Sequence, residues 1–212
     1  MADHLAYWAD HADKFAEATL EHLALVGSVL AYSLIIATLI TLLVRRSERV
    51  GQLVVAILGA VYSVPSLALF SLLIPLTGLG FSTAVVVMVA YNQFLLVRNF
   101  TEGLAGVDRD IIEAARGMGM SERQLLMKVQ LPLALPMIVA GVRLAAISTI
   151  GIATIAATIN AGGLGEILFS GLRTMNEYKI VGGTLLCVLV AVIAHAGLLG
   201  AETLLRKGLE HR

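Results

Sequence analysis

Few residues in this chain have a type and spacing that would support chemistry. His4 and His11 lie seven positions apart, each directly after an aspartate, as in a metal site or on a solvated polar helix face. We adopt the polar face as the simpler interpretation. The sequence has no glycine-rich loop ending in Gly-Lys-Ser or Gly-Lys-Thr, no Cys/His ligand cluster and no Ser/His/Asp set in a suitable context. We therefore expect no metal, no bound ATP or other cofactor and no catalytic residue in this chain.

The elements that carry the remaining polar residues are predicted to be membrane helices. Of the 212 residues, 58% are hydrophobic and only 14% are charged, against about 25% charged in an average soluble domain. The apolar residues fall in blocks long enough to cross about 30 Å of hydrocarbon. Five spans are predicted, over residues 22–44, 52–76, 81–97, 132–157 and 180–205. The fold class is an all-α integral membrane protein in a lipid bilayer, with no nucleic-acid partner.

Basic residues are concentrated at one end of the predicted spans. One side holds Arg45, Arg46, Arg49, Arg98, Arg109, Arg116, Arg123, Lys128, Arg206, Lys207 and Arg212. The other side holds Lys14, Arg173 and Lys179. The positive-inside rule then places the N-terminus outside and the C-terminus in the cytoplasm.

The predicted spans and their orientation give the domain organisation. Residues 1–21, where apolar residues recur at three- and four-residue steps among Asp and His, are predicted as an external amphipathic helix at the membrane interface. Residues 22–205 form the transmembrane domain with a cytoplasmic loop over 99–132, and residues 206–212 form a cytoplasmic tail. A glycine-rich stretch over 160–179 is too short and polar for a sixth span, and we expect a short helix or a partly re-entrant segment.

The cytoplasmic loop is the longest polar interruption in the chain. Asp108 is a good N-cap, and Gly119 is expected to end the helix that Asp108 begins. Ser121, with a glutamine three residues later, has capping-box spacing for a second helix. Leu131-Pro132 is expected to end that second helix, because a residue before proline avoids helical backbone. The loop is predicted as a helix–turn–helix, and an amphipathic loop resting on lipid is the alternative.

The spacing within this loop resembles the EAA loop of ABC-importer permeases. That pattern is Glu-Ala-Ala, three residues, Gly, nine residues, an aliphatic residue, one residue and Leu-Pro. The matching positions are Glu113, Ala114, Ala115, Gly119, Val129, Leu131 and Pro132, with Met118 in the same segment. The resemblance implies a coupling helix that binds a groove on the ATPase subunit, with Glu113 as a polar contact and Gly119 as the turn.

Further motifs resemble the osmoprotectant branch of these permeases, which transports glycine betaine, carnitine, choline or proline. They are Val64-Pro65-Ser66-Leu67-Ala68-Leu69, residues 131–136, Gly141-Val142-Arg143 and Ala161-Gly162-Gly163-Leu164-Gly165. The resemblance covers roughly residues 22–205. It implies a type I ABC-importer-like transmembrane domain in the inner membrane of a prokaryote.

The resemblance also implies the partners. They are two ABC ATPase subunits that bind ATP and Mg, a second permease subunit that is identical or paralogous, and an extracytoplasmic solute-binding protein. Two alternatives stay open: a permease for an amino acid or a thiol-related betaine, and a self-sufficient channel or secondary carrier. A carrier would need coupling carboxylates inside the membrane, and no predicted span has one in its core.

Polar residues inside the spans mark a candidate translocation pathway. They are Tyr62, Ser63, Pro65, Ser66, Asn92, Gln93, Thr154, Thr158 and Asn160. Pro65 is predicted to bend the second span. Asn92 and Gln93 could either line the pathway or join helices by hydrogen bonds. Arg143, which costs about 2.5–3.5 kcal/mol to place in a membrane, is predicted to pair with helix-end carbonyls or loop carboxylates and not to contact solute.

Overall fold

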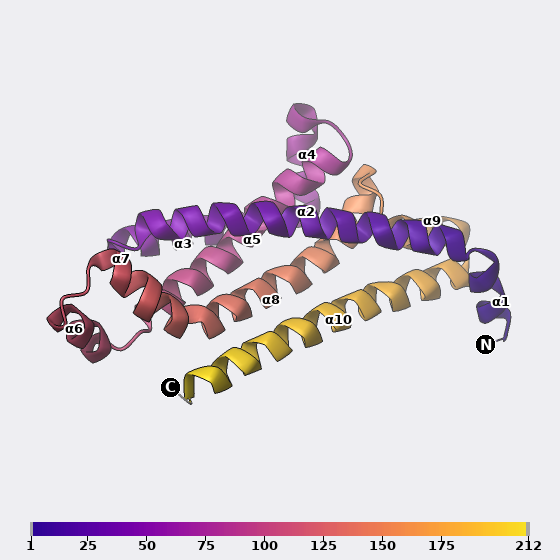
Figure 1. Cartoon of the computed structure of the whole chain (residues 1–212). Coiled ribbons are helices and arrows are strands. Elements are labelled where there is room, and N and C mark those ends of the chain that lie inside the picture. The colour runs from indigo at the N-terminus through magenta and orange to yellow at the C-terminus, as the bar shows by residue number, and fades with distance from the viewer. Residues whose placement is uncertain (1, 211–212) are drawn as a thin grey trace.

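The computed structural model describes residues 2–210, and every regular element among them is a helix (Figure 1). The long helices lie side by side, with α6, α7 and the C-terminus at one end and the N-terminus, α9 and the start of α10 at the other. The helices are α1 (Ala2–Asp10), α2 (Ala12–Val44), α3 (Glu48–Tyr62), α4 (Ser66–Thr77), α5 (Phe81–Ala105), α6 (Arg109–Gly117), α7 (Glu122–Leu125), α8 (Leu131–Ala156), α9 (Leu164–Thr174) and α10 (Glu177–Glu210).

The predicted membrane class is confirmed by the lengths of these helices. Within residues 2–210, four segments are long and apolar enough to cross a bilayer: Ala12–Val44, Phe81–Ala105, Glu122–Ile159 and Glu177–Gly208. The bent pair α3 and α4 supplies a fifth if it counts as one broken span. Helix α9, with 11 residues, is about 16 Å long at 1.5 Å per residue, so the expected short helix is present in place of a sixth span.

Helix α5 lies at the centre of the bundle, in contact with α2, α3, α4 and α8. Its contacts with α2 and α8 bury Leu25, Val87 and Ala153 completely. Several of the fully buried positions are alanines, including Ala84 and Ala145. Small residues let membrane helices approach closely, because in lipid the helices associate through van der Waals contact and hydrogen bonds.

The second predicted span is broken into two helices. The bend that we predicted at Pro65 is confirmed, but the angle between α3 and α4 is 91°, and α4 projects away from the bundle in Figure 1. The second predicted span, over 52–76, is therefore a pair of helices joined at a sharp bend. Pro65 has extended backbone (φ −58°, ψ 134°) and is the N-cap of α4. The hydroxyl of Tyr91 donates a hydrogen bond to the carbonyl of Val64, which lies outside both helices.

The predicted end of the second loop helix at Leu131-Pro132 is also wrong. The chain stays helical from Glu122 to Ile159. A π turn over Leu126–Gln130 precedes the proline, and the N–H of Leu131 bonds to the carbonyl of Leu126. A π turn widens the helix by one residue, which moves the carbonyls that the proline ring would otherwise meet. The second loop helix and the fourth span are therefore one helix.

The first 21 residues differ from the single helix that we predicted. Helix α1 ends at Asp10, and α2 begins at Ala12 and continues into the first span. With 33 residues, α2 is about 50 Å long. Helix α1 is held against the start of α10 by a 2.9 Å hydrogen bond from the indole N–H of Trp8 to the carbonyl of Tyr178. Placement of this segment at a membrane interface stays a prediction.

Candidate functional site

The predicted coupling loop forms the two short helices α6 and α7 at one end of the bundle (Figure 1). Helix α6 begins where Asp108 caps it, since the carboxylate accepts a hydrogen bond of 2.9 Å from the N–H of Asp110. Helix α7 begins at Ser121, which forms the full capping box with Gln124. Both predicted N-caps are confirmed, and each satisfies backbone donors that a helix start leaves free.

Gly119 forms the turn between the two helices. Its φ is +82°, a conformation that costs little for glycine and is unfavourable for residues with a Cβ. The N–H of Gly119 bonds to the carbonyl of Arg116 at 2.9 Å, and the N–H of Met120 bonds to the carbonyl of Ala115 at 3.2 Å. These two bonds form a Schellman motif, so the glycine that the sequence placed at the turn has a specific backbone role.

An exposed ion pair and two buried apolar side chains hold the helices of the loop in place. Arg116 and Glu122 form an ion pair of 3.1 Å, but both side chains are more than half exposed, so the pair contributes little to stability. The buried anchors are Ala115 and Leu125, which are 2% and 1% exposed. The loop is therefore positioned by its caps, its glycine turn and two buried apolar side chains.

The face of α6 that points away from the bundle is apolar. Ile111 is 45% exposed and Met118 is 73% exposed, and Ala114 lies exposed between them at helical spacing. The Glu113 carboxylate is exposed beside this stripe. An exposed apolar stripe next to a charge is typical of a protein–protein or a membrane contact. Leu131 and Pro132 are half-buried in the long helix, so the structure separates them from the exposed surface.

Asn92 joins three helices in the interior of the bundle. Its amide N–H groups donate to Thr149 Oγ1 on α8 at 2.8 Å and to Ser33 Oγ on α2 at 3.3 Å. All three side chains are at most 1% exposed. Gln93 donates to the carbonyls of Val89 at 3.0 Å and of Ser33 at 3.5 Å. Of the two interpretations left open, hydrogen bonding between helices is the one that these contacts support.

We expect the change Asn92→Leu to lower the stability of the permease by about 1 kcal/mol, the typical worth of a hydrogen bond between membrane helices. Transport per folded complex should stay unchanged, because Asn92 is buried against protein. Thermal unfolding in detergent and uptake into vesicles measure the two quantities. The change Thr149→Val removes the same bridge from the other helix, so the double variant should lose less than the sum of the two single losses. A normal melting temperature with altered uptake would place Asn92 in the pathway.

The other predicted pathway residues lie in three separate places. Tyr62, Ser63, Pro65 and Ser66 form the break between α3 and α4, where the ring of Tyr62 lies edge-on to Tyr91, with centroids 5.5 Å apart. Thr158 and Asn160 line a cavity of about 520 Å³ at the opposite end from α6. Thr154 bonds to the carbonyl of its own helix at Ile150 and lies 3.6 Å from Cys187 Sγ. One chain therefore does not bring these residues into a single channel.

Arg143 has a partner that the sequence did not indicate. Its guanidinium bonds to Glu202 of α10 at 3.1 Å, and the two side chains are only 19% and 12% exposed. Pairing with a carboxylate agrees with the structural role that we predicted. The carboxylate belongs to a long apolar helix and not to a loop.

Among the described residues, no group of three or more His, Cys, Asp or Glu side chains is arranged to hold a metal ion. His4 and His11 instead belong to an aromatic cluster. The ring of His4 lies 4.7 Å from that of Tyr178, and the ring of His11 stacks on Tyr7 at 4.2 Å.

Comparison with known proteins gives the family. Residues 22–210 match the family described as "Binding-protein-dependent transport system inner membrane component". The chain is 32% identical over 194 residues to the "Carnitine transport permease protein OpuCB" of Listeria monocytogenes, covering 92% of this chain and 89% of that protein. It is 34% identical over 196 residues to the "Osmoprotectant import permease protein OsmW" of Salmonella typhimurium, covering 90% and 91%.

The fold is similar to that of a solved transporter subunit. A chain of the MetNI methionine ABC transporter, in an inward facing conformation, superposes with a TM-score of 0.83 at 22% identity, covering 90% of this chain and 95% of that chain. The structural likeness supports the fold, and the family match and the sequence identities show the family to which the chain belongs. The chain therefore belongs to the family of binding-protein-dependent transport system inner membrane components, the multi-pass permease subunits of ABC importers.

Proposed function

We propose that this chain is the permease of an ATP-driven importer for a quaternary ammonium osmoprotectant such as glycine betaine, carnitine or choline. The observation that carries the proposal is the exposed face of α6, where Ile111, Ala114 and Met118 form an apolar stripe beside Glu113. Such a face is typical of a protein or a membrane contact, and an ATPase groove would cover it. The substrate class is supported by the two named relatives, which are described as carnitine and osmoprotectant permeases.

The proposed assembly contains two ATPase subunits that bind ATP and Mg, two permease subunits and an extracytoplasmic binding protein, in the inner membrane of a prokaryote. The end of the bundle with α6 faces the cytoplasm, because the basic residues are concentrated there. The continuous helix from Glu122 to Ile159 connects the proposed ATPase contact directly to the opposite end of the bundle. When ATP brings the ATPases together, movement of α6 and α7 is passed along one helix to the end that carries Thr158.

The test is reconstitution of the permease with its ATPase and binding protein in vesicles. We expect solute-loaded binding protein to stimulate ATP hydrolysis and solute uptake in the wild type. The change Glu113→Ala removes a polar contact of a kind worth about 1.5–3 kcal/mol, so stimulation should fall by about tenfold or more. The matched control is Glu102→Ala, which removes an exposed carboxylate that pairs with Arg98 at the end of α5 and should leave stimulation unchanged.

Two results would contradict the proposal. If loaded binding protein fails to stimulate ATP hydrolysis and Glu113→Ala changes nothing, the coupling role is wrong. Uptake that persists without any ATPase would favour a self-sufficient channel or carrier. Stimulation by an amino acid or a thiol-related betaine, and not by glycine betaine, carnitine or choline, would keep the mechanism and change the substrate.

A further inference from the structure

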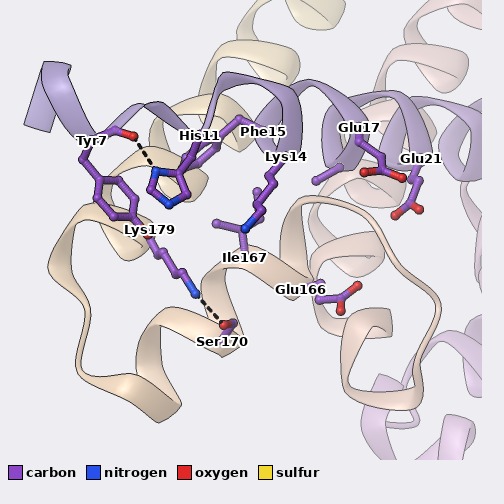
Figure 2. A pocket seen from close by; sticks show the side chains of 11 residues that line it. Tyr7, His11, Lys14, Phe15, Glu17, Glu21, Glu166, Ile167, Ser170 and Lys179 are labelled. Carbon is purple, nitrogen blue, oxygen red and sulfur yellow. Dashed lines mark hydrogen bonds between the residues drawn. The ribbon is translucent and has the colours of Figure 1, made fainter. Parts of the chain in front are cut away.

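The end of the bundle opposite α6 contains a cavity between α1, α2, α9 and α10 (Figure 2). Its volume is about 330 Å³. Small-molecule sites occupy about 300–1,000 Å³, so the cavity is large enough for a solute with a dozen or fewer heavy atoms. It lies at the end that the basic residues place outside the membrane, where solute would arrive.

Charge is unevenly distributed around this cavity. Figure 2 shows the ammonium groups of Lys14 and Lys179 on one side and the carboxylates of Glu17, Glu21 and Glu166 on the other. No ion pair of 4.0 Å or less joins these lysines to these carboxylates among the side chains that the structure describes. Because the lysines and the carboxylates do not pair with one another, both are available to bind a ligand that carries a positive and a negative group.

Two of the charged groups are held in place by neighbouring groups. Lys179 Nζ donates to Ser170 Oγ at 3.1 Å, and Glu21 Oε2 accepts a 2.9 Å hydrogen bond from the N–H of Gly163. The helices that carry them are also fixed. A Cβ at Gly182 of α10 would lie 2.7 Å from Trp8 Nε1 on α1 and 2.9 Å from the ring of Phe15 on α2, so both helices lie directly on the α10 backbone. A preformed site loses less entropy when a ligand binds.

Aromatic rings close the lysine side of the cavity. Tyr7 stacks between His11 and Tyr178, with centroid distances of 4.2 Å and 5.1 Å. Figure 2 places Tyr7 and His11 with the lysines and away from the carboxylates. A cationic group of a ligand would therefore be recognised by the carboxylates and not by an aromatic cage. The cavity therefore requires a ligand that carries a negative group at one end and a positive group at the other.

The cavity adjoins the outer end of the helix that begins at the coupling loop. Glu21 and Glu166 also line the second cavity, of about 520 Å³, together with Thr158 and Asn160. A ligand held between the lysines and the glutamates would lie next to the residues that follow α8. This position suits a site that receives solute before it enters the membrane.

We propose that this cavity is an external binding site for a small zwitterion. The ligand carboxylate would lie between Lys14 and Lys179, and its cationic group would face Glu17, Glu21 and Glu166. The inference rests on the proposed function and narrows its substrate class. Glycine betaine and carnitine carry both charges, whereas choline has no carboxylate for the lysines.

The test uses the full chain in lipid nanodiscs without binding protein. Glycine betaine is titrated while the emission of Trp8, the single tryptophan of the chain, is recorded, and equilibrium dialysis with radiolabelled betaine gives the stoichiometry. We expect saturable binding that choline does not displace at equal concentration. The changes Lys179→Met and Glu166→Gln should each weaken binding by about tenfold or more, since each removes a charged hydrogen-bonding partner.

Control variants at the other end, Lys128→Met and Glu122→Gln, should bind betaine as the wild type does. Absence of saturable binding would overturn the inference, as would choline binding that equals betaine binding. In a parallel titration of the same nanodiscs with binding protein, cavity variants that weakened only the affinity for that protein would also overturn the inference, because the cavity would then be a protein contact. Loaded binding protein that still stimulates ATP hydrolysis in any of these cases leaves the proposed function intact. Betaine binding without such stimulation would contradict the proposed function alone.

Discussion

The change Gly165→Ala is expected to destabilise the permease by about 3 kcal/mol or more, at the upper end of the range for overpacked interiors. A Cβ at Gly165 would lie 2.0 Å from the carbonyl oxygen of Thr154 and 2.8 Å from the Cβ of Ala157. Both obstacles are backbone or Cβ atoms of the helix that α9 crosses, so no side-chain rotation relieves the clash. Either α9 moves away from α8, or the end of α8 unwinds.

Thermal unfolding of the purified chain in detergent measures this loss. The matched control is Gly151→Ala, also a glycine-to-alanine change in the same region, where nothing lies within 4 Å of the added Cβ. Gly151 is inside α8, so alanine should raise stability by up to about 1 kcal/mol through helix propensity. The two variants are thus expected to shift the melting temperature in opposite directions. A Gly165→Ala protein that melts like the wild type would mean that α9 does not contact α8 in this way.

Features that depend on neighbouring residues could be predicted from the sequence. The caps at Asp108 and Ser121 and the turn at Gly119 each involve groups within five residues along the chain. Their chemistry is local, so a residue type at a fixed offset specifies the bond. The lengths of the apolar segments gave the membrane class for the same reason, because a bilayer requires a minimum helix length.

Features that depend on tertiary contacts could not be predicted. The angle at Pro65 involves a hydrogen bond from Tyr91, on another helix, to the carbonyl of Val64. Helix continuity through Pro132 requires a π turn, which no residue type specifies. The cavity proposed to bind a zwitterion takes its charged residues from α2, α9 and α10, and only the fold brings Lys14 and Lys179 to the same side.

The second large effect is expected at the ion pair between Arg143 and Glu202. The pair joins α8 to α10 at 3.1 Å, and both side chains are more than four-fifths buried. Taking two charges out of water is costly, and their attraction offsets that cost only while both are present. Removal of one partner from a buried pair destabilises a protein by about 3–5 kcal/mol. We expect a loss in this range for Glu202→Leu, measured by thermal unfolding in detergent and by yield in the membrane.

The two single variants should not be equivalent. In Glu202→Leu, the guanidinium stays charged, because arginine does not lose its proton in proteins. In Arg143→Leu, the remaining carboxylate can take up a proton and become neutral, which lowers the cost of burial. Arg143→Leu is therefore expected to be the milder change. Equal losses would mean that the energy comes mainly from side-chain contacts and not from an unpaired charge.

The double variant Arg143→Leu with Glu202→Leu separates a structural role from a transport role. Replacing a whole buried pair by apolar residues is often neutral or stabilising, so the double variant should melt within a few degrees of the wild type. It should also retain uptake stimulated by loaded binding protein, because the arginine Nη2 bonds to Glu202 and only a fifth of the side chain is exposed. A stable double variant that has lost uptake would show that Arg143 acts on the solute. Full uptake would show that the charge pair serves to hold α10 against α8, the helix that continues from the predicted coupling loop.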